Sequence, residues 1–468
     1  MTVSVPADVI SRLKAVLGEG GWSQDPDRLA PKLVEERGRW HGTTPLLALP
    51  KTVEQVAAVV GVCFESSTPI VPQGGNTGLV AGQVPQGEIL LSLERMRAVR
   101  EVTPLDDVLV AEAGVTLAAV REAAAGAGRL FPLSLASEGS CTVGGLISTN
   151  AGGTAVLRYG TMRELVLGIE AVLPNGEIFR GLKRLRKDNT GYDLTQLLIG
   201  AEGTLGVVTA ASLKLYPQPV SRAVGMVGLQ TAQGAIELLA LAKRESAGGV
   251  EAFELMSRMS MDFVLKNVPG LREPLEGRHP WYVLVETISG DPTGAEAALE
   301  RLLAGALEAD LIQDAVIAQT EAQAKTLWRL REDLSGAQKP EGVNWKHDIS
   351  VPVSRIPEFL ARADAALETR WPGLRIAAFG HVGDGNLHYN IAQPPGDGAA
   401  FDRDRDAGAK MVHDIVADLG GSISAEHGLG AMKTKEALTY KSPVEVEALR
   451  AVRRALDPKR IMNPRVLF

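Results

Sequence analysis

Four side chains that could bind a metal ion or move a proton lie in two short segments near the end of the chain. FGHVGDGNLHYN contains His381 and His388, and SAEHGLG contains Glu426 and His427. Two neutral imidazoles and one carboxylate form the ligand set of many catalytic zinc sites, which keep one position open for water or substrate. We therefore predict a divalent metal, most readily zinc, bound by His381, His388 and Glu426.

The spacing of the first two histidines predicts a β-hairpin. Residues 383–386 read Gly-Asp-Gly-Asn, a sequence that favours tight turns, so each histidine would end one strand. His388 and Asn390 are two residues apart on the second strand and would share a face. A single histidine is more often a hydrogen-bonded structural residue. The clustering of three histidines and a glutamate, in a chain with only 7 histidines, favours the metal site.

Composition limits the class of protein. The 468 residues can form several domains, and 45% hydrophobic with 22% charged residues is typical of soluble globular proteins. The net charge of −7 and the lack of a basic stripe argue against nucleic acid as a partner. Only Cys63 and Cys141 occur, and no apolar run reaches 18 residues. Since the N-terminal residues resemble neither a signal nor a transit peptide, we expect a cytoplasmic, or at most peripheral, protein without a membrane span.

Glycine-rich loops dominate the first half of the chain. A helix is predicted after Pro50, with Thr52 and Gln55 as its capping box. A short strand then enters the loop Gly74–Gly78, whose backbone amides could face an anion, although a simple turn is the structural alternative.

Two more such loops follow. Residues 137–160 are so rich in glycine and small hydroxyl side chains that we expect a backbone surface for close approach of a flat ligand, not a packed helix face. A glycine turn is expected at residues 200–206, and residues 173–177 predict a hairpin turn over Pro-Asn-Gly. Three glycine-rich loops suit an extended dinucleotide, but the G-x-G-x-x-G pattern of a Rossmann domain is missing.

Collinear motifs give the chain a family resemblance. PQGGNTGLVAG, GSCTVGGLISTNAGG and GAEGTLGV, followed by FGHVGDGNLH, SAEHGLG and DPKRIMNP, resemble the FAD-dependent D-2-hydroxy acid dehydrogenases of the vanillyl-alcohol-oxidase fold. The resemblance covers about residues 45–468. It implies an α+β protein with a PCMH-type FAD-binding domain of two α+β subdomains at 1–220. An α+β cap with an antiparallel sheet would follow at 221–425, and a C-terminal helical segment at 426–468 would return to the flavin.

The resemblance also implies how FAD is held. Because the loop at residues 74–82 has no histidine for covalent attachment, we expect non-covalent FAD. The expected contact residues are Pro72, Gly74, Gly75, Asn76, Thr77, Gly78, Gly139, Ser140, Thr142, Gly145, Ser148, Thr149, Asn150, Gly152, Glu202, Gly203, Val207 and Asn463.

The middle of the chain predicts a cap sheet with helices on one side. Strands are expected near 225–229, 250–256, 281–289 and 345–351, and helices near 231–245, 293–307, 319–337 and 354–369.

Three residues of the cap could bind a substrate with two carboxylates. Arg331 and Ser335 are four apart on a predicted helix, and Lys346 precedes a predicted strand. A guanidinium suits one carboxylate and an ammonium a second, although surface charge is an equal alternative on the residues alone. The positions match the pattern of D-2-hydroxyglutarate dehydrogenases, with serine where threonine is common. Lys346 favours a dicarboxylate.

These expectations combine into a reaction. The metal would bind the 2-hydroxyl and adjacent carboxylate of D-2-hydroxyglutarate, His427 would take the proton as general base, and FAD would accept the hydride from C2. Asn390 could position the substrate, whereas His347 and His413 are read as structural.

Several alternatives stay open at this stage. D-lactate, D-malate or another D-2-hydroxy acid is the alternative substrate, and a flavin sensor or an oxygen-using oxidase is the alternative class. We expect a homodimer and an external acceptor, either an electron-transfer flavoprotein or a quinone-linked carrier.

Overall fold

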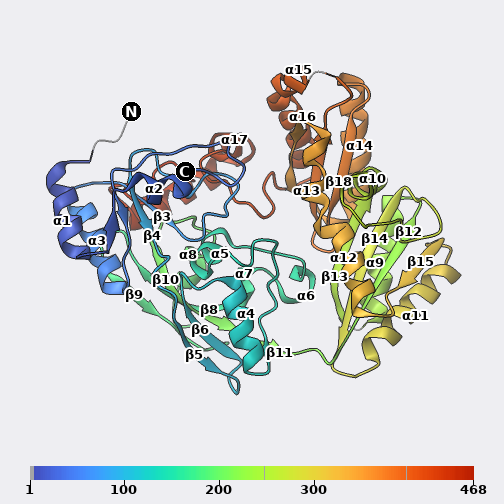
Figure 1. Cartoon of the computed structure of the whole chain (residues 1–468), viewed down its shortest axis with the longest axis horizontal. Coiled ribbons are helices and arrows are strands. Elements are labelled where there is room, and N and C mark those ends of the chain that lie inside the picture. Colours follow the sequence, from blue (N-terminus) through green and yellow to red (C-terminus); the bar gives the residue numbers. More distant parts are fainter. Residues whose placement is uncertain (1–4, 247, 397, 468) are drawn as a thin grey trace. The chain divides into compact units, whose positions relative to one another are not determined.

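The computed structural model describes residues 5–246, 248–396 and 398–467. The chain forms two compact units. The first contains residues up to Gly153, residues 159–218 and residues 426–468, and the second contains residues 154–158 and 219–425. Both mix helices with β-sheets (Figure 1), which confirms the α+β fold class.

The first sheet of the first unit carries the first glycine-rich loop. Its strands run in the order β1 (Trp22–Ser23), β2 (Leu47–Ala48), β4 (Ile89–Ser92) and β3 (Ile70–Gln73), and both β2 and β3 are parallel to β4. The predicted helix after Pro50 is α3 (Val53–Glu65), which packs on α1 (Ala7–Leu17) through a shared apolar core. Its start is capped by the Thr52 side chain, which accepts the N–H of Gln55.

The second sheet of the first unit is five-stranded and antiparallel. Its order is β5 (Val99–Thr103), β6 (Val108–Glu112), β10 (Val207–Lys214), β8 (Val166–Val172) and β9 (Ile178–Gly181). The predicted hairpin over Pro174-Asn175-Gly176 joins β8 to β9.

The glycine- and serine-rich segment differs from the sequence expectation, because it contains the short helix α5 (Val143–Thr149). Val143, Leu146 and Ile147 are buried, so three apolar residues at helical spacing do form a packed face. Gly144 permits this packing, since a Cβ there would lie 2.8 Å from the Cβ of Ala113. The high content of small residues concealed this apolar stripe.

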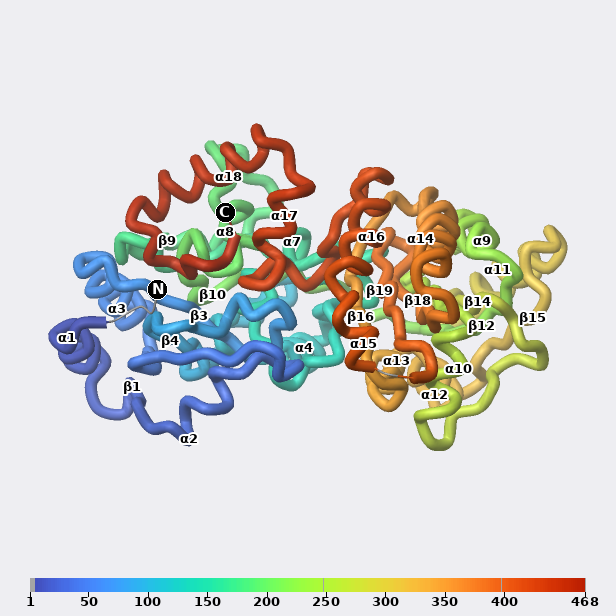
Figure 2. Tube along the Cα trace, turned by 90° about the horizontal axis from the view of Figure 1, so that it is seen from above, coloured from blue at the N-terminus to red at the C-terminus, as the bar shows by residue number. Residues whose placement is uncertain are grey.

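The C-terminal segment returns to the first sheet. After α17 (Thr434–Tyr440) and α18 (Pro443–Leu456), Met462 forms a parallel bridge with Ile70 of β3, and the Ile70 N–H donates to the carbonyl of Ile461 at 2.8 Å. In Figure 2 the red C-terminal tube lies beside the blue N-terminal strands. Buried Arg453 closes the tail by donating to the carbonyls of Met462 and Val466.

The second unit is built on one antiparallel sheet. Its order is β15 (Asp314–Ile317), β12 (Ser221–Leu229), β14 (Trp281–Ser289), β13 (Val250–Ser257), β18 (Arg375–His381), β19 (Asn386–Ala392) and β16 (Asn344–Trp345). A further strand, β17 (Asp348–Ser350), also pairs with β19. The strand expected near 345–351 is therefore two short strands, with Lys346 and His347 between them.

Helices cover both faces of this sheet, so the expectation of helices on one side is wrong. Met226 of β12 packs with Leu327 and Leu330 of α12 (Glu321–Glu332), which lie in one core with α10 (Arg258–Asn267). The neighbouring Gly225 faces Leu299 of α11 (Gly294–Glu308), which packs on α9 (Ala232–Glu245). Successive strand residues point to opposite faces, so the two helix pairs lie on opposite sides of the sheet.

The predicted histidine hairpin is confirmed as β18 and β19. Phe379 pairs with His388, and His381 ends the first strand. Gly385 in the turn has φ +91°, a conformation that L side chains rarely adopt, and a Cβ there would lie 2.2 Å from the carbonyl oxygen of Val351. The turn therefore depends on this glycine.

We predict that Gly385→Ala destabilises the protein by about 2 kcal/mol or more, because it adds backbone strain and a backbone clash. Thermal unfolding would show this as a lowered Tm. Gly336→Ala is the matched control: Gly336 lies in α13 (Leu334–Ala337) with nothing within 4 Å of an added Cβ. Its Tm should stay or rise slightly, and equal Tm values for both variants would contradict the role given to Gly385.

Candidate cofactor cavity and metal centre

The first unit contains a cavity of about 580 Å³ between its glycine-rich loops. Most of the predicted cofactor residues line it, together with Glu426, His427 and Asn463 of the C-terminal segment. The predicted residues in the lining are Pro72, Gly74, Gly75, Asn76, Thr77, Gly78, Ser140, Thr142, Gly145, Ser148, Thr149, Gly152, Glu202, Gly203, Val207 and Asn463. The three loops read from the sequence thus surround one cavity.

Gly139 and Asn150 are not part of this lining. Asn150 ends α5 in the left-handed conformation with φ 51°. Its Oδ1 accepts the N–H of Arg163 and the hydroxyl of Thr161, each at 2.9 Å. The structure therefore places Asn150 in the scaffold behind the cavity.

Glu202 binds the backbone that follows His427. Its two carboxylate oxygens accept the N–H groups of Leu429, at 2.9 Å, and Gly430, at 2.7 Å. Burial raises the pKa of this carboxyl group, and the two backbone donors partly offset that effect. Asn463 adds a second connection, since its Nδ2 donates to the carbonyl of Glu202 at 2.8 Å. The family resemblance gave Glu202 only as an expected FAD contact, and the sequence gave no sign of these long-range contacts.

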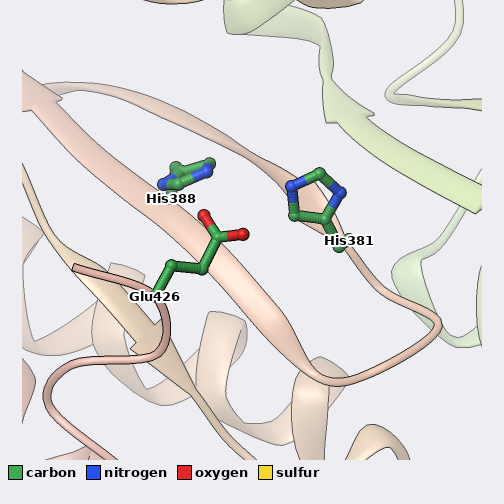
Figure 3. A group of neighbouring side chains, drawn as sticks. All are labelled: His381, His388 and Glu426. Carbon is green, nitrogen blue, oxygen red and sulfur yellow. The ribbon is translucent and has the colours of Figure 1, made fainter. Parts of the chain in front are cut away.

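The three predicted metal ligands lie together (Figure 3). His381, His388 and Glu426 each offer a ligand atom, and these atoms all lie within 4.8 Å of one another. The two histidines come from β18 and β19. Glu426 follows Ala425, whose N–H donates to the carbonyl of Asp348 at 3.3 Å, and Asp348 is the cross-strand partner of His388.

A second possible ligand group overlaps the first. Asp348, Glu426 and His427 also offer ligand atoms within 4.8 Å of one another. Asp348 is buried, and its Oδ1 accepts a hydrogen bond from Nδ2 of Asn386 at 3.0 Å. Sequence reasoning missed Asp348, although its place two residues after Lys346 in a short strand was visible.

A buried carboxylate joins a predicted metal ligand to a predicted substrate residue. Glu254 of β13 is the cross-strand partner of His381, and its Oε1 lies 2.6 Å from Nδ1 of that histidine. Its Oε2 accepts a hydrogen bond from Nε of Arg331 at 2.7 Å. Burial alone would raise the pKa of Glu254, but the charges and hydrogen bonds of the two partners outweigh it and lower the pKa to about 2. The sequence gave no sign of this role, because Glu254 stands in a largely apolar segment that was expected only as a strand of the cap.

The predicted substrate residues lie in different elements and differ in burial. The predicted helix breaks at Asp333, which puts buried Arg331 in α12 and exposed Ser335 in α13. Lys346 is half-buried between β16 and β17. Asn390 is buried, and its Nδ2 donates to Oε1 of Gln338 at 3.0 Å.

The two histidines read as structural are both buried. His347 and His413 meet edge-on with ring centroids 5.4 Å apart. Nδ1 of His347 lies 2.7 Å from the carbonyl oxygen of Tyr389.

Comparison with known proteins agrees with this architecture. Residues 44–181 match the FAD binding domain family, and residues 218–467 match the FAD linked oxidases, C-terminal domain. The mitochondrial D-2-hydroxyglutarate dehydrogenase of Arabidopsis thaliana is 38% identical over 464 residues, covering 98% of this chain and 81% of the relative. The D-2-hydroxyglutarate dehydrogenase of Xanthomonas citri pv. viticola is also 38% identical, covering 92% of this chain and 90% of the relative.

A solved structure supports the expected PCMH-type fold. P-cresol methylhydroxylase with substrate bound matches with a TM-score of 0.77 and 16% identity, covering 98% of this chain and 96% of that chain. The fold expected from the sequence is therefore confirmed. By sequence over nearly its whole length, the chain belongs to the FAD-linked oxidase family, as an FAD-dependent oxidoreductase related to the D-2-hydroxyglutarate dehydrogenases.

Proposed function

We propose that this protein oxidises D-2-hydroxyglutarate to 2-oxoglutarate, with non-covalent FAD as hydride acceptor and a divalent metal, most readily zinc, bound by His381, His388 and Glu426. The observation that supports this most is the hydrogen-bonded chain from Arg331 through Glu254 to His381. It supports a carboxylate-binding role for Arg331, because a hydroxy acid on a metal would need a guanidinium close to the proposed metal ligands. The relatives named above support the same substrate.

The backbone around the cavity fits a flat cofactor. A Cβ on Gly75 would lie 1.9 Å from the carbonyl oxygen of Ser140, and one on Gly74 would lie 2.4 Å from Oγ1 of Thr142. These loops therefore pack more closely than side chains would permit, and the same glycines line the cavity. Bound there, FAD would supply the ring that accepts a hydride.

The donor set fits a divalent metal. Two imidazoles and a carboxylate are the common ligands of catalytic zinc, and the contact of His381 Nδ1 with Glu254 leaves its Nε2 as the atom for a metal. A metal held there would supply positive charge that lowers the pKa of the substrate hydroxyl.

The remaining tasks fall to named side chains. His427 follows a metal ligand and lines the cavity, so it is the proposed general base for the 2-hydroxyl proton. Arg331 and Lys346, with Ser335 and Asn390, are the proposed substrate contacts. Among these, the two cations would bind the carboxylates of a dicarboxylic acid.

We also propose an external electron acceptor, either an electron-transfer flavoprotein or a quinone-linked carrier, and a homodimer in the cytoplasm. The two cysteines, Cys63 and Cys141, are buried free thiols, which suits a reducing compartment. None of the helices in the described ranges is long and apolar enough to cross a bilayer.

We predict that Gly75→Ala strongly reduces the FAD content of the purified protein, because the added Cβ meets the backbone of residue 140. The ratio of flavin absorbance near 450 nm to protein absorbance measures this. Gly139→Ala is the control, since nothing lies within 4 Å of its added Cβ. Full FAD content in Gly75→Ala would argue against the cavity as the flavin site.

We expect D-2-hydroxyglutarate to reduce the bound flavin under anaerobic conditions, and L-2-hydroxyglutarate not to. Stopped-flow absorbance would compare both with D-lactate and D-malate, before and after removal of metal by a chelator. Faster reduction by D-lactate would move the assignment to a monocarboxylate. Reduction that survives complete metal removal would refute the metal's part in the reaction.

For Lys346→Ala we predict a KM for D-2-hydroxyglutarate raised by about tenfold or more, with a much smaller change for D-lactate, because only the longer acid has a second carboxylate. Steady-state kinetics with an artificial acceptor measures both values. Lys339→Ala is the control. It removes an exposed lysine between α13 and β16, seven positions before Lys346, and should change neither KM. Equal effects of Lys346→Ala on both substrates would remove Lys346 from the distal carboxylate.

A further inference from the structure

Glu254 has contacts that its place in a core strand does not require. The side chain is completely buried on β13, yet one oxygen faces His381 at 2.6 Å and the other faces Arg331 at 2.7 Å. These partners belong to different elements, the end of β18 and the last turn of α12. A buried carboxylate is costly unless both of its oxygens are paired, so its presence indicates a specific requirement at this position.

We propose that Glu254 is a positioning residue that fixes a metal ligand and a substrate-binding arginine with a single carboxylate. The inference rests on the proposed function for the identity of the metal and substrate sites. The metal site and the substrate site would both be held by hydrogen bonds to Glu254, so a substitution of Glu254 would disturb both of them.

Glu254 first fixes His381. A carboxylate at Nδ1 selects the tautomer that has a proton on Nδ1 and a lone pair on Nε2. The cross-strand pairing of Glu254 with His381 fixes the ring direction as well, since directly opposite residues on neighbouring strands point to the same face of the sheet. Carboxylate partners of this kind also raise the basicity of a metal-bound imidazole.

Glu254 also fixes Arg331. Glu254 occupies its Nε, and the structure gives its two Nη atoms no hydrogen-bond partner among the described residues. The guanidinium also lies over the ring of Phe379, with 4.9 Å from its carbon to the ring centroid. A guanidinium fixed at Nε and on one face keeps its Nη edge for a carboxylate, which is the edge used in bidentate pairs.

Phe379 adds a second connection between the same two sites. Its ring centroid lies 5.0 Å from that of His388, the other histidine of the metal group. Arg331 is thus linked to one histidine through Glu254 and to the other through Phe379. Glu254 and Phe379, the two connecting residues, both belong to strands of the second unit's sheet.

The test is Glu254→Gln in the FAD-bound protein, with Zn²⁺ as the probe. Glutamine keeps the size of the side chain but carries no charge and offers only one carbonyl acceptor to two donors. Competition with a chromophoric chelator gives the Kd for Zn²⁺ without any substrate. We expect a Kd raised by about 10- to 100-fold, the usual effect of losing a carboxylate behind a metal-bound histidine.

The matched control is Glu286→Gln. Glu286 is a buried glutamate of the adjacent strand β14, and it accepts a hydrogen bond from Nε1 of Trp328 on the same helix as Arg331. Its partners are Arg222, Glu251 and Trp328, and burial raises its pKa, so a neutral side chain suits this site. The control should keep the Kd for Zn²⁺ within about twofold of wild type.

A second measurement separates positioning from general damage. At Zn²⁺ concentrations that saturate Glu254→Gln, we expect the KM for D-2-hydroxyglutarate to stay at least about fivefold above wild type, because Arg331 is no longer oriented. Flavin content and Tm should stay near those of Glu286→Gln. If Glu254→Gln does not fold, Glu254→Asp replaces it: the shorter carboxylate cannot reach both partners, and the Kd for Zn²⁺ or the KM should rise.

Wild-type Zn²⁺ affinity in the folded variant would overturn the proposal, as would failure of wild type to bind Zn²⁺ at all. A raised Kd for Zn²⁺ with a normal KM at saturating Zn²⁺ would show that Glu254 does not orient Arg331 for substrate binding. If the Kd rises as expected but no D-2-hydroxy acid reduces the wild-type flavin, the proposed function fails while the role of Glu254 at the metal group stands.

Discussion

The second unit depends on one electrostatic constraint: a carboxylate inside a β-sheet must have partners for both oxygens. Glu254 meets this constraint with an imidazole on one side and a guanidinium on the other. The two partners must therefore lie at fixed places, one on the next strand and one on a helix packed over the sheet. Removing one partner of such a buried charge commonly costs about 3–5 kcal/mol, which makes this arrangement hard to vary.

The first unit uses a buried carboxylate in a different way. In the described ranges no cation pairs with Glu202, which accepts two backbone N–H groups from the segment that follows His427. This contact joins a glycine turn at residues 200–206 to residues more than 220 positions later. The two glutamates thus perform related tasks: Glu254 orients side chains, and Glu202 holds the backbone next to the proposed general base.

The sequence predicted those features whose signals are local. The histidine hairpin followed from its turn residues, and the three glycine-rich loops were found because close backbone approach requires glycine at positions such as Gly75. Helix α5 was missed because its apolar stripe is only three residues long. Glu254 and Glu202 were not recognised as positioning groups, nor Asp348 as a possible ligand, since their roles come from pairing between distant segments. The family resemblance supplied the cofactor and the order of the domains, which spacing alone could not give.

In the proposed site, the hairpin β18–β19 binds a metal through His381 and His388 together with Glu426, which leaves His427 to act as a base. The overlapping group of Asp348, Glu426 and His427 is the competing arrangement. Anomalous diffraction at the zinc absorption edge, from crystals of the zinc-loaded protein, distinguishes the two directly. We predict one anomalous peak within bonding distance of His381, His388 and Glu426; a peak bound by His427 and Asp348 would contradict this ligand assignment.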